Sequence, residues 1–344
     1  MSTPGKVERI DPKAGIPGGE VTLEYESVSA VSARALDFNF HGASGTVTAA
    51  GRTRALVRLP EISALEPVQV VTNLGADNEI ASTLRLLVGR KITGDVHPVT
   101  NPTFDPDDGL LYVTRSGSRG EHVPISILAV EANGVVEDVS GDIMNPTAIA
   151  FDRLGRMFVT SRFDGVVYRV GREREPTAFA GDLGIATGLA FNRDGEMFVG
   201  DRSGTIYRIN EIGESSKWAE HEPSVSAYHL AFGPDDALYV TGPTVSSFDS
   251  ITRFNEEGIG STFYRGLGRP QGLAFDRQGN LYVAASLKGR RGIVRISPDG
   301  RQAEIVVAGM NLVGLAFSPH GEMVVATNEA VYGLPLGIEG ALVN

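Results

Sequence analysis

The chain contains no cysteine, and this absence excludes a disulfide framework and a thiol nucleophile. No hydrophobic run reaches the length of a membrane span, so we expect no membrane partner. The formal net charge of −11 argues against nucleic acid as the partner of the surface as a whole. Only six histidines are present, and none has the H-x-x-x-H or H-E-x-x-H spacing of helical metal sites.

The start of the chain, MSTPGKVERIDPKAG, lacks the apolar segment of a secretory signal. We therefore expect a cytoplasmic protein. A periplasmic or secreted protein whose signal had been removed would begin in the same way, so that location stays open. The sequence does not indicate an oligomeric state.

One phrase recurs through the last two-thirds of the sequence, for example as ATGLAFNRDGEMFVGD and PQGLAFDRQGNLYVAA. Its six copies align on one aromatic residue, at intervals of 40 to 47: Phe104, Phe151, Phe191, Phe232, Phe275 and Phe317. Each copy has short apolar runs around a tight turn, which is typical of the blades of a β-propeller. A helical solenoid would need long apolar stripes of period 3.6, and none is present. Residues 91–344 are therefore predicted to form a six-bladed β-propeller.

The last copy ends about where its outer strand should form. An open sheet edge invites aggregation, so we expect another segment to close the ring. Two segments could do so: the tail ALVN at the end of the chain, or a strand near Val88–Thr93 inserted beside the last blade.

Residues 1–90 do not share the repeat. They hold short, mostly alternating segments separated by turn residues about every ten positions, which predicts a small β-sandwich. The run I-x-P-x-x-G-x-x-G-G-x-V-T from Ile10 to Thr22 resembles the opening of IPT/TIG domains, which are immunoglobulin-like. The later LVRLP and VQVVTNLG fit the same family. The resemblance implies a spacer, a dimerisation face or a protein-binding module. We expect no DNA contact, because there is no dense stripe of Lys and Arg.

The propeller units resemble NHL repeats, and equally the senescence-marker-protein and gluconolactonase family, on GLAFDRQGNLYVAA and GLAFNRDGEMFVGD. The first resemblance implies protein or ligand binding. The second implies a lactone hydrolase with a divalent ion at one mouth of the central channel, held by oxygen ligands at the starts of the inner strands. Blade motifs do not separate these functions, so the decision rests on the site residues.

The gluconolactonase family has a metal-binding asparagine in the segment P-N-G-L, and we call the position of this asparagine in each repeat the slot. Here the slot holds Thr100, Thr147, Thr187, Tyr228, Gln271 and Val313, none of which is a carboxylate. No E-G-P segment precedes the first copy, and the best substitutes for the missing ligands are Asn101, Gln271 and Asp201. These residues make a poor site for calcium or zinc, so we expect no metal site and no cofactor. The slot threonines are interpreted as bonding to nearby backbone groups.

Two further residues beside the channel have both a structural and a functional interpretation. Asp201 ends an apolar run, where it could accept N–H bonds of the next turn or act as a metal ligand or general base. His229 replaces the glycine of G-L-A-F beside Tyr228. Its structural interpretation is a partly buried, hydrogen-bonded histidine, and its functional interpretation is a general base or a ligand contact. His97 is a second candidate. Serine catalysis has no support, because G-x-S-x-G is absent in a strand–turn–helix setting.

Basic residues gather in the loops that share one face with the slots: Arg115, Arg119, Arg162, Arg202, Lys288, Arg290 and Arg291. Fewer acids oppose them: Asp164, Asp201, Asp249 and Glu329. A concave, positive mouth would attract an anion, and arginine contacts carboxylate or phosphate in a bidentate way. The alternative is solvated loop charge with local ion pairs.

The sequence therefore predicts a binding protein without a catalytic residue, whose mouth takes a small anionic ligand or an acidic protein partner. Whether the chain is an enzyme stays open. The alternative is a gluconolactonase-like hydrolase of lactones or esters with a rearranged ligand set, and only this alternative needs Ca, Zn or Mn. The candidate ligand-binding residues are Asn101, Arg115, Thr147, Arg162, Thr187, Asp201, Arg202, Tyr228, His229, Gln271 and Asn328.

Overall fold

The computed structural model describes residues 3–62, 64, 66–73, 79–117, 121–131, 133–171 and 174–341. Strands make up nearly all the regular structure of these residues, and α1 (Ala30–Ala33) is their one helix. The all-β fold class is confirmed. None of the described helices is long and apolar enough to cross a membrane. The chain divides into two compact units: residues 1–90 with 290–294 and 304–310, and the rest of the chain.

The first unit is a β-sandwich of two sheets. One sheet has the order β1-β3-β7-β6, with β1 (Val7–Asp11), β3 (Glu20–Tyr25), β7 (Arg54–Arg58) and β6 (Thr46–Ala50). The other has the order β2-β9-β8-β4-β5, with β2 (Ala14–Gly15), β9 (Glu79–Val88), β8 (Val68–Asn73), β4 (Asp37–Phe40) and β5 (Ala43–Ser44). Alternate residues of a strand point to opposite faces, and those facing inward, such as Leu23, Phe38 and Val57, form one core.

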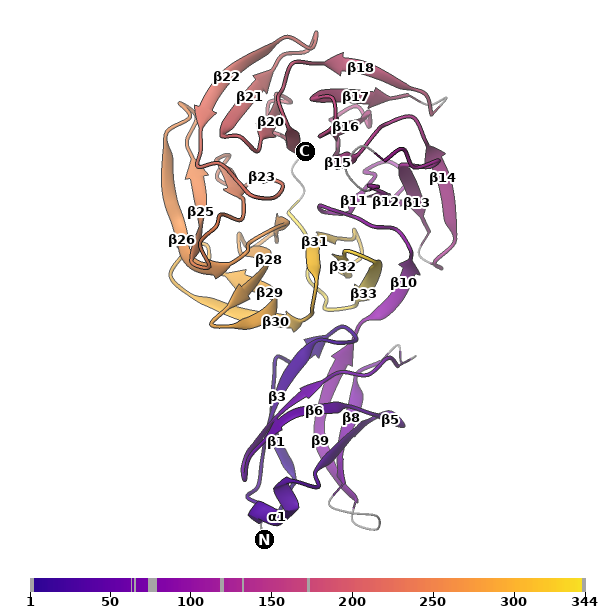
Figure 1. The fold of residues 1–344 in the computed structure, drawn as a ribbon, viewed down its shortest axis with the longest axis vertical. Helices are drawn as coiled ribbons and strands as arrows, with labels where there is room; N and C mark the ends of the chain where they lie inside the picture. The colour runs from indigo at the N-terminus through magenta and orange to yellow at the C-terminus, as the bar shows by residue number, and fades with distance from the viewer. Residues whose placement is uncertain are drawn as a thin grey trace. The chain divides into compact units, whose positions relative to one another are not determined.

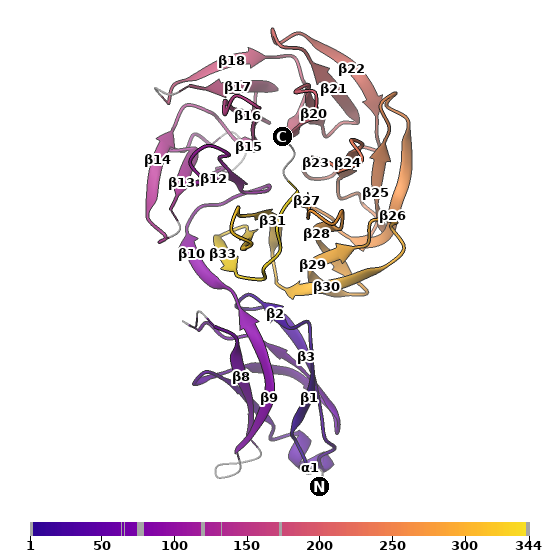
Figure 2. The ribbon, with the colours of Figure 1, turned by 180° about the vertical axis from the view of Figure 1, so that it is seen from behind.

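The second unit is a β-propeller, whose sheets follow one another around a central axis in Figures 1 and 2. The described residues form four separate four-stranded sheets of this kind, and the strands β23–β26 and β27–β30 make two further groups of four within one larger sheet. We call these six groups blades 1 to 6. The first three blades comprise β11 (Thr103–Phe104), β12 (Leu111–Thr114), β13 (Ile127–Val130) and β14 (Val136–Ser140); β15 (Pro146–Phe151), β16 (Met157–Ser161), β17 (Val166–Val170) and β18 (Pro176–Ala180); and β19 (Ala186–Phe191), β20 (Met197–Asp201), β21 (Thr205–Ile209) and β22 (Ser215–Glu220).

The remaining blades repeat this order from the axis outward. They comprise β23 (His229–Phe232), β24 (Leu238–Thr241), β25 (Asp249–Phe254) and β26 (Gly260–Gly268); β27 (Leu273–Phe275), β28 (Leu281–Leu287), β29 (Arg290–Ile296) and β30 (Ala303–Ala308); and β31 (Leu312–Phe317), β32 (Met323–Thr327), β33 (Ala330–Leu334) and β10 (Arg90–Gly94). We call the four strands of a blade A to D. Because neighbouring strands are antiparallel, the B–C loops and the D–A turns share one face, the mouth face.

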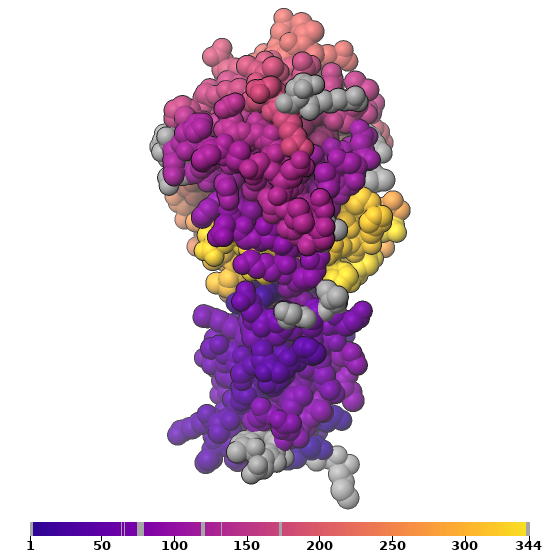
Figure 3. Space-filling view, turned by 90° about the vertical axis from the view of Figure 1, so that its right-hand side faces the viewer, coloured from indigo at the N-terminus to yellow at the C-terminus, as the bar shows by residue number. Residues whose placement is uncertain are grey.

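The recurring aromatic residue fastens each blade to the one before it. Its ring meets an aromatic ring of the preceding strand B at five seams, with centroids 4.8 to 5.5 Å apart: Tyr112–Phe151, Phe158–Phe191, Phe198–Phe232, Tyr239–Phe275 and Tyr282–Phe317. Edge-to-face pairs of this kind add stability beyond the apolar area that they bury. Figure 3 is a space-filling view from the side of the propeller on which β14 is the outer strand.

The polar residue after the aromatic shapes the turn between strands A and B. Oδ1 of Asp152 accepts the N–H groups of Leu154 and Arg156, both at 2.9 Å. Asn192 bonds to its own turn in the same way, at 2.8 Å to the Glu196 N–H. The next glycine, Gly195, has φ +85°, which side chains rarely adopt. The repeated F-D/N-x-x-G is therefore a turn motif.

The ring closes at two places. At the outside, β10 completes blade 6 in the sheet order β10-β33-β32-β31, so the segment near Val88–Thr93 supplies the closing strand. The alternative tail ALVN lies outside the described residues except for Ala341, whose N–H bonds to Phe275 O at 2.9 Å. At the axis, Asn101 of blade 1 bonds to blades 5 and 6.

Candidate functional site

The slot backbone is held by hydroxyl groups of the neighbouring blades. Thr160 Oγ1 donates to Thr187 O at 3.1 Å, and Thr241 Oγ1 donates to Gln271 O at 2.6 Å. Thr147 O accepts from Thr100 and Thr114 at 2.7 and 3.2 Å. A threonine at the end of strand B thus ties its blade to the slot of the next one. These hydroxyl groups satisfy buried carbonyls, as a closely packed channel requires.

Three candidate residues of the slots have buried side chains. Thr147 is 0% exposed and Thr187 is 1% exposed. Thr187 Oγ1 donates to Gly200 O at 3.2 Å and accepts the N–H of Tyr228 at 3.0 Å. Tyr228 is 0% exposed, and its hydroxyl donates to Glu222 O. These side chains hold the blades together and present no polar group to a ligand.

Asn101 is a ring-closing residue. Its Nδ2 donates to Leu273 O at 2.8 Å, and its Oδ1 accepts the N–H of Leu315 at 3.1 Å. Gly272 and Gly314 make room for it, because a Cβ on Gly314 would lie 2.6 Å from the backbone of Asn101. Both polar atoms of the amide are in use, so Asn101 does not replace the missing asparagine ligand.

Asp201 stabilises two turns of blade 3. It is 4% exposed, and its Oδ1 accepts the N–H groups of Ile185 and Ser203 at 2.9 and 3.0 Å. Its Oδ2 accepts the hydroxyl of Ser203. The first bond reaches the D–A turn and the others lie in the B–C loop. The structure therefore supports the structural interpretation of Asp201.

Arg162 and Arg202 occupy equivalent positions in adjacent blades. Each follows strand B and donates its N–H to the D–A turn of its own blade, to Asn145 O at 3.3 Å and to Ile185 O at 3.2 Å. Their guanidinium groups differ. Arg162 reaches Ser116 Oγ at 3.2 Å in the long loop of blade 1, whereas no described residue bonds to the guanidinium of Arg202.

The other basic candidates are used in different ways. Arg115 donates to Asp95 O at 2.6 and 3.1 Å, which fixes the entry to blade 1. Arg290 pairs with Asp11 within the first unit, at 2.7 Å. Lys288 is exposed, and Arg119 lies outside the described residues. Gln271 and Asn328 reach the mouth face, and their side-chain amides bond to no described residue.

The sequence interpretation omitted carboxylates of the D–A turns. Asp95, Asp142 and Asp182 are exposed on the mouth face, so positive charge is confined to a part of this face. Three of the four acids that were expected to oppose the arginines, Asp164, Asp201 and Asp249, have carboxylates that are bonded locally. Asp164 accepts the hydroxyl of Tyr168 at 2.5 Å, and Asp249 accepts that of Thr244 at 2.6 Å. Neither forms an ion pair with a described arginine.

His229 is a buried histidine of β23. It is 4% exposed, and its Nε2 has no hydrogen-bond partner among the described residues. Burial lowers the pKa of His229 to about 3, so the ring is neutral at neutral pH. The second candidate histidine, His97, is exposed at the entry to blade 1. Of the two histidines weighed from the sequence, only His229 has a buried polar atom without a partner.

Acid is expected to destabilise the propeller through His229. Its pKa is lower in the folded chain than the unfolded value of about 6.5, so the unfolded chain binds more protons below that pH. Stability is therefore lost as the pH falls, by about 2–3 kcal/mol between pH 6.5 and 4.5. Denaturant melts at pH 6.5 and 4.5 measure this loss of stability. In His229→Leu the loss should be smaller than in the parent chain by this amount, and in the control His320→Gln, at an exposed histidine, it should equal that of the parent. Equal losses in all three proteins would contradict this assignment.

A metal centre needs several ligating side chains close together. The described residues contain no group of three or more His, Asp or Glu side chains that could hold a metal ion. The slot residues Thr147, Thr187 and Tyr228 are buried and bonded. The side-chain oxygen of Asn101 already accepts the N–H of Leu315. The residues at the axis thus do not fit the calcium, zinc or manganese site that the hydrolase alternative requires.

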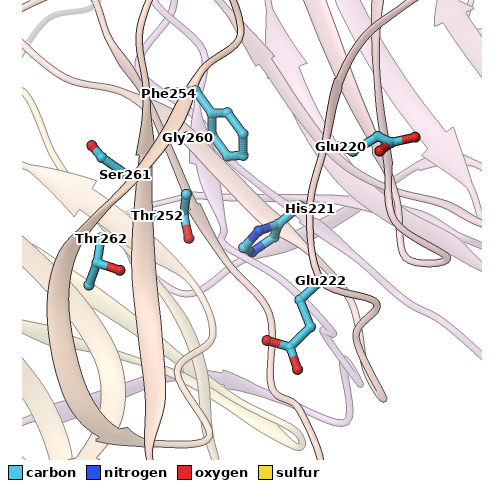
Figure 4. A pocket seen from close by; sticks show the side chains of 8 residues that line it. All are labelled: Glu220, His221, Glu222, Thr252, Phe254, Gly260, Ser261 and Thr262. Atoms are coloured by element: carbon cyan, nitrogen blue, oxygen red, sulfur yellow. The ribbon is translucent and has the colours of Figure 1, made fainter.

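His221 stands in no motif of the sequence. This residue lines an open pocket between β22 and the pair β25–β26, together with Glu222 and Thr252 (Figure 4). The pocket brings together residues of two blades, and no motif marks it.

Comparisons with known proteins show the fold. No protein-family model and no curated protein matches the chain. An auxiliary nutrient binding protein from Bacteroides thetaiotaomicron is 12% identical over 96% of this chain and 97% of that one, with a TM-score of 0.55. A gluconolactonase from Xanthomonas campestris is 17% identical over 71% of this chain and 88% of that one, with a TM-score of 0.59. Virginiamycin B lyase from Staphylococcus aureus is 14% identical over 71% and 97%, with a TM-score of 0.53.

These structures are too distant in sequence to carry a function. They support the β-propeller, and they include gluconolactonase-like and nutrient-binding proteins. A binding role and a hydrolase-like role are both compatible with this set, so the side chains at the mouth decide between them.

Proposed function

We propose that this chain is a binding protein whose propeller mouth takes a small anionic ligand. The observation that carries the proposal is the guanidinium of Arg202, which is partly buried and bonds to no described residue. Removing an arginine from bulk water without a carboxylate partner costs free energy, and an anion would return that energy. An acidic segment of a protein partner would supply the same chemistry.

The surrounding residues support an anion at this place. Arg162 holds the equivalent position in the adjacent blade, and Gln271 offers an amide at the slot of blade 5. The nearest acid in sequence, Asp201, is committed to its own turns. The site therefore offers the guanidinium of Arg202 and the side-chain amide of Gln271, neither of which bonds to a described residue.

Arg202→Gln is expected to weaken the binding of a small anion about tenfold, because it removes one charge-assisted hydrogen bond. Isothermal titration of the full chain with D-gluconate, citrate and inorganic phosphate measures this effect. Arg193→Gln, on the opposite face at the A–B turn of blade 3, is the matched control. The proposal fails if none of the three anions binds, or if the two variants bind them equally.

The alternative is a hydrolase that resembles gluconolactonase. Structures of such enzymes share the fold, but the described residues of this chain contain no group of three or more His, Asp or Glu side chains that could hold a metal ion. Turnover of D-glucono-1,5-lactone, measured with and without Ca²⁺, Zn²⁺ or Mn²⁺, tests it directly. Metal-dependent turnover would replace the binding role by the hydrolase role.

For the first unit, the proposed role is that of the IPT/TIG-like domains that it resembles in sequence: a spacer, a dimerisation face or a protein-binding module. Its sandwich fold supports this role. Deletion of this unit would also remove part of β10, so the role is better tested by substitutions on its exposed surface.

A further inference from the structure

A polar pocket lies between the outer strands of blades 3 and 4. Its volume of about 390 Å³ falls within the range of small-molecule sites. His221 and Glu222 line it from the blade 3 side, and Thr252, Phe254, Ser261 and Thr262 line it from β25 and β26 (Figure 4). All of these residues belong to the second unit.

His221 offers an uncommitted imidazole to this pocket. Its ring packs against Phe254 and Tyr228, with centroids 5.8 and 5.4 Å apart, and its backbone N–H donates to Gly204 O at 2.9 Å. No described residue bonds to either ring nitrogen. Burial lowers the pKa of His221 to about 4, so at neutral pH the fixed ring presents one N–H donor and one lone pair.

The two neighbouring glutamates differ in their use. Glu220 forms an ion pair with Lys217, and its carboxylate points away from His221 in Figure 4. The carboxylate of Glu222 has no partner among the described residues. The pocket therefore has one carboxylate without an ion-pair partner among the described residues, that of Glu222, and one neutral acceptor, the imidazole of His221.

Hydroxyl groups form the opposite wall. Ser261 Oγ donates to Arg253 O at 3.3 Å, whereas the hydroxyl groups of Thr252 and Thr262 bond to no described residue. A hydroxyl donates and accepts, so this wall can pair with hydroxyl groups of a ligand. An anion would meet the charge of Glu222 and is disfavoured.

We propose that this pocket binds a small ligand that carries an ammonium group beside several hydroxyl groups. The ammonium group donates to the Glu222 carboxylate and to the His221 lone pair. The ligand hydroxyl groups pair with Thr252 and Thr262. This site and the anion site at the mouth share no residue.

The only tryptophan of the chain reports on the pocket. Trp218 lies on β22, and its ring is 5.9 Å from that of Phe254, which lines the pocket. Titration of the full chain with D-glucosamine, followed by Trp218 emission and by calorimetry, is therefore expected to show saturable binding. D-Glucose, which has a hydroxyl in place of the ammonium group, is expected to bind at least tenfold more weakly.

Glu222→Gln is expected to weaken D-glucosamine binding about tenfold, and Thr252→Val about threefold. The control Glu257→Gln removes the same charge from an exposed turn of blade 4 and should bind as the parent does. Equal binding of D-glucose and D-glucosamine would overturn the assignment of an ammonium group. Absence of binding, or equal affinity of the Glu222 and Glu257 variants, would overturn the site.

Discussion

Asn101→Asp is expected to lower the free energy of unfolding of the propeller by about 3 kcal/mol at pH 7. The two side chains have the same shape, but Asp replaces the Nδ2 donor, which bonds to Leu273 O at 2.8 Å, by a charged acceptor. The backbones of Gly272 and Gly314 lie too close for the side chain to move away. For a unit of this size the loss corresponds to a fall in Tm of roughly 6–12 °C.

The pH dependence of this loss identifies its cause. A carboxylate that faces a carbonyl oxygen has a raised pKa, and once protonated it donates a hydrogen bond again. The deficit relative to the parent chain should therefore shrink as the pH is lowered from 7 to 4. Asn255→Asp is the control, because only the Oδ1 of Asn255 is bonded, to the Ile259 N–H at 2.8 Å. Equal melting of both variants at pH 7 would show that Asn101 does not close the ring.

The blades could be predicted because the repeat encodes local structure. A period near 40 reports strands and turns, and the recurring aromatic turned out to be the contact between adjacent blades. The two closures could not be predicted with the same precision. They join residues far apart in the sequence, such as Asn101 and Leu315, and no periodic pattern marks such a pair.

The candidate site was harder to predict, because its residue types serve the structure as readily as they serve binding. Thr187 and Tyr228 occupy the expected positions, yet their polar atoms are bonded within the protein. The positive charge of the mouth face was overestimated, because Asp142 and Asp182 of the D–A turns are exposed on the same face. The pocket at His221 needs strands of two blades side by side, so its residues carry no signal of their own in the sequence.

Asp201 provides the second test of structure against catalysis. Asp201→Ala is expected to cost about 2 kcal/mol, because it leaves the N–H groups of Ile185 and Ser203, whose bonds to Asp201 are partly buried, without their acceptor. Asp201→Asn is expected to cost less than about 1 kcal/mol. Both N–H groups bond to the same oxygen, Oδ1, which Asn retains, and the Ser203 hydroxyl can reverse its bond to accept from the new amide.

Denaturant melts of both Asp201 variants measure the difference, and titration with the anion that binds the parent chain measures the effect on the mouth. A turn-stabilising carboxylate gives a stable Asn variant with unchanged affinity, since Arg202 is kept in place. A metal ligand or general base predicts a different pattern. The Asn variant would then lose function as completely as the Ala variant, although its stability would be nearly unchanged. Because Asn preserves the acceptor and removes the charge, these two roles of one side chain predict different results in one experiment.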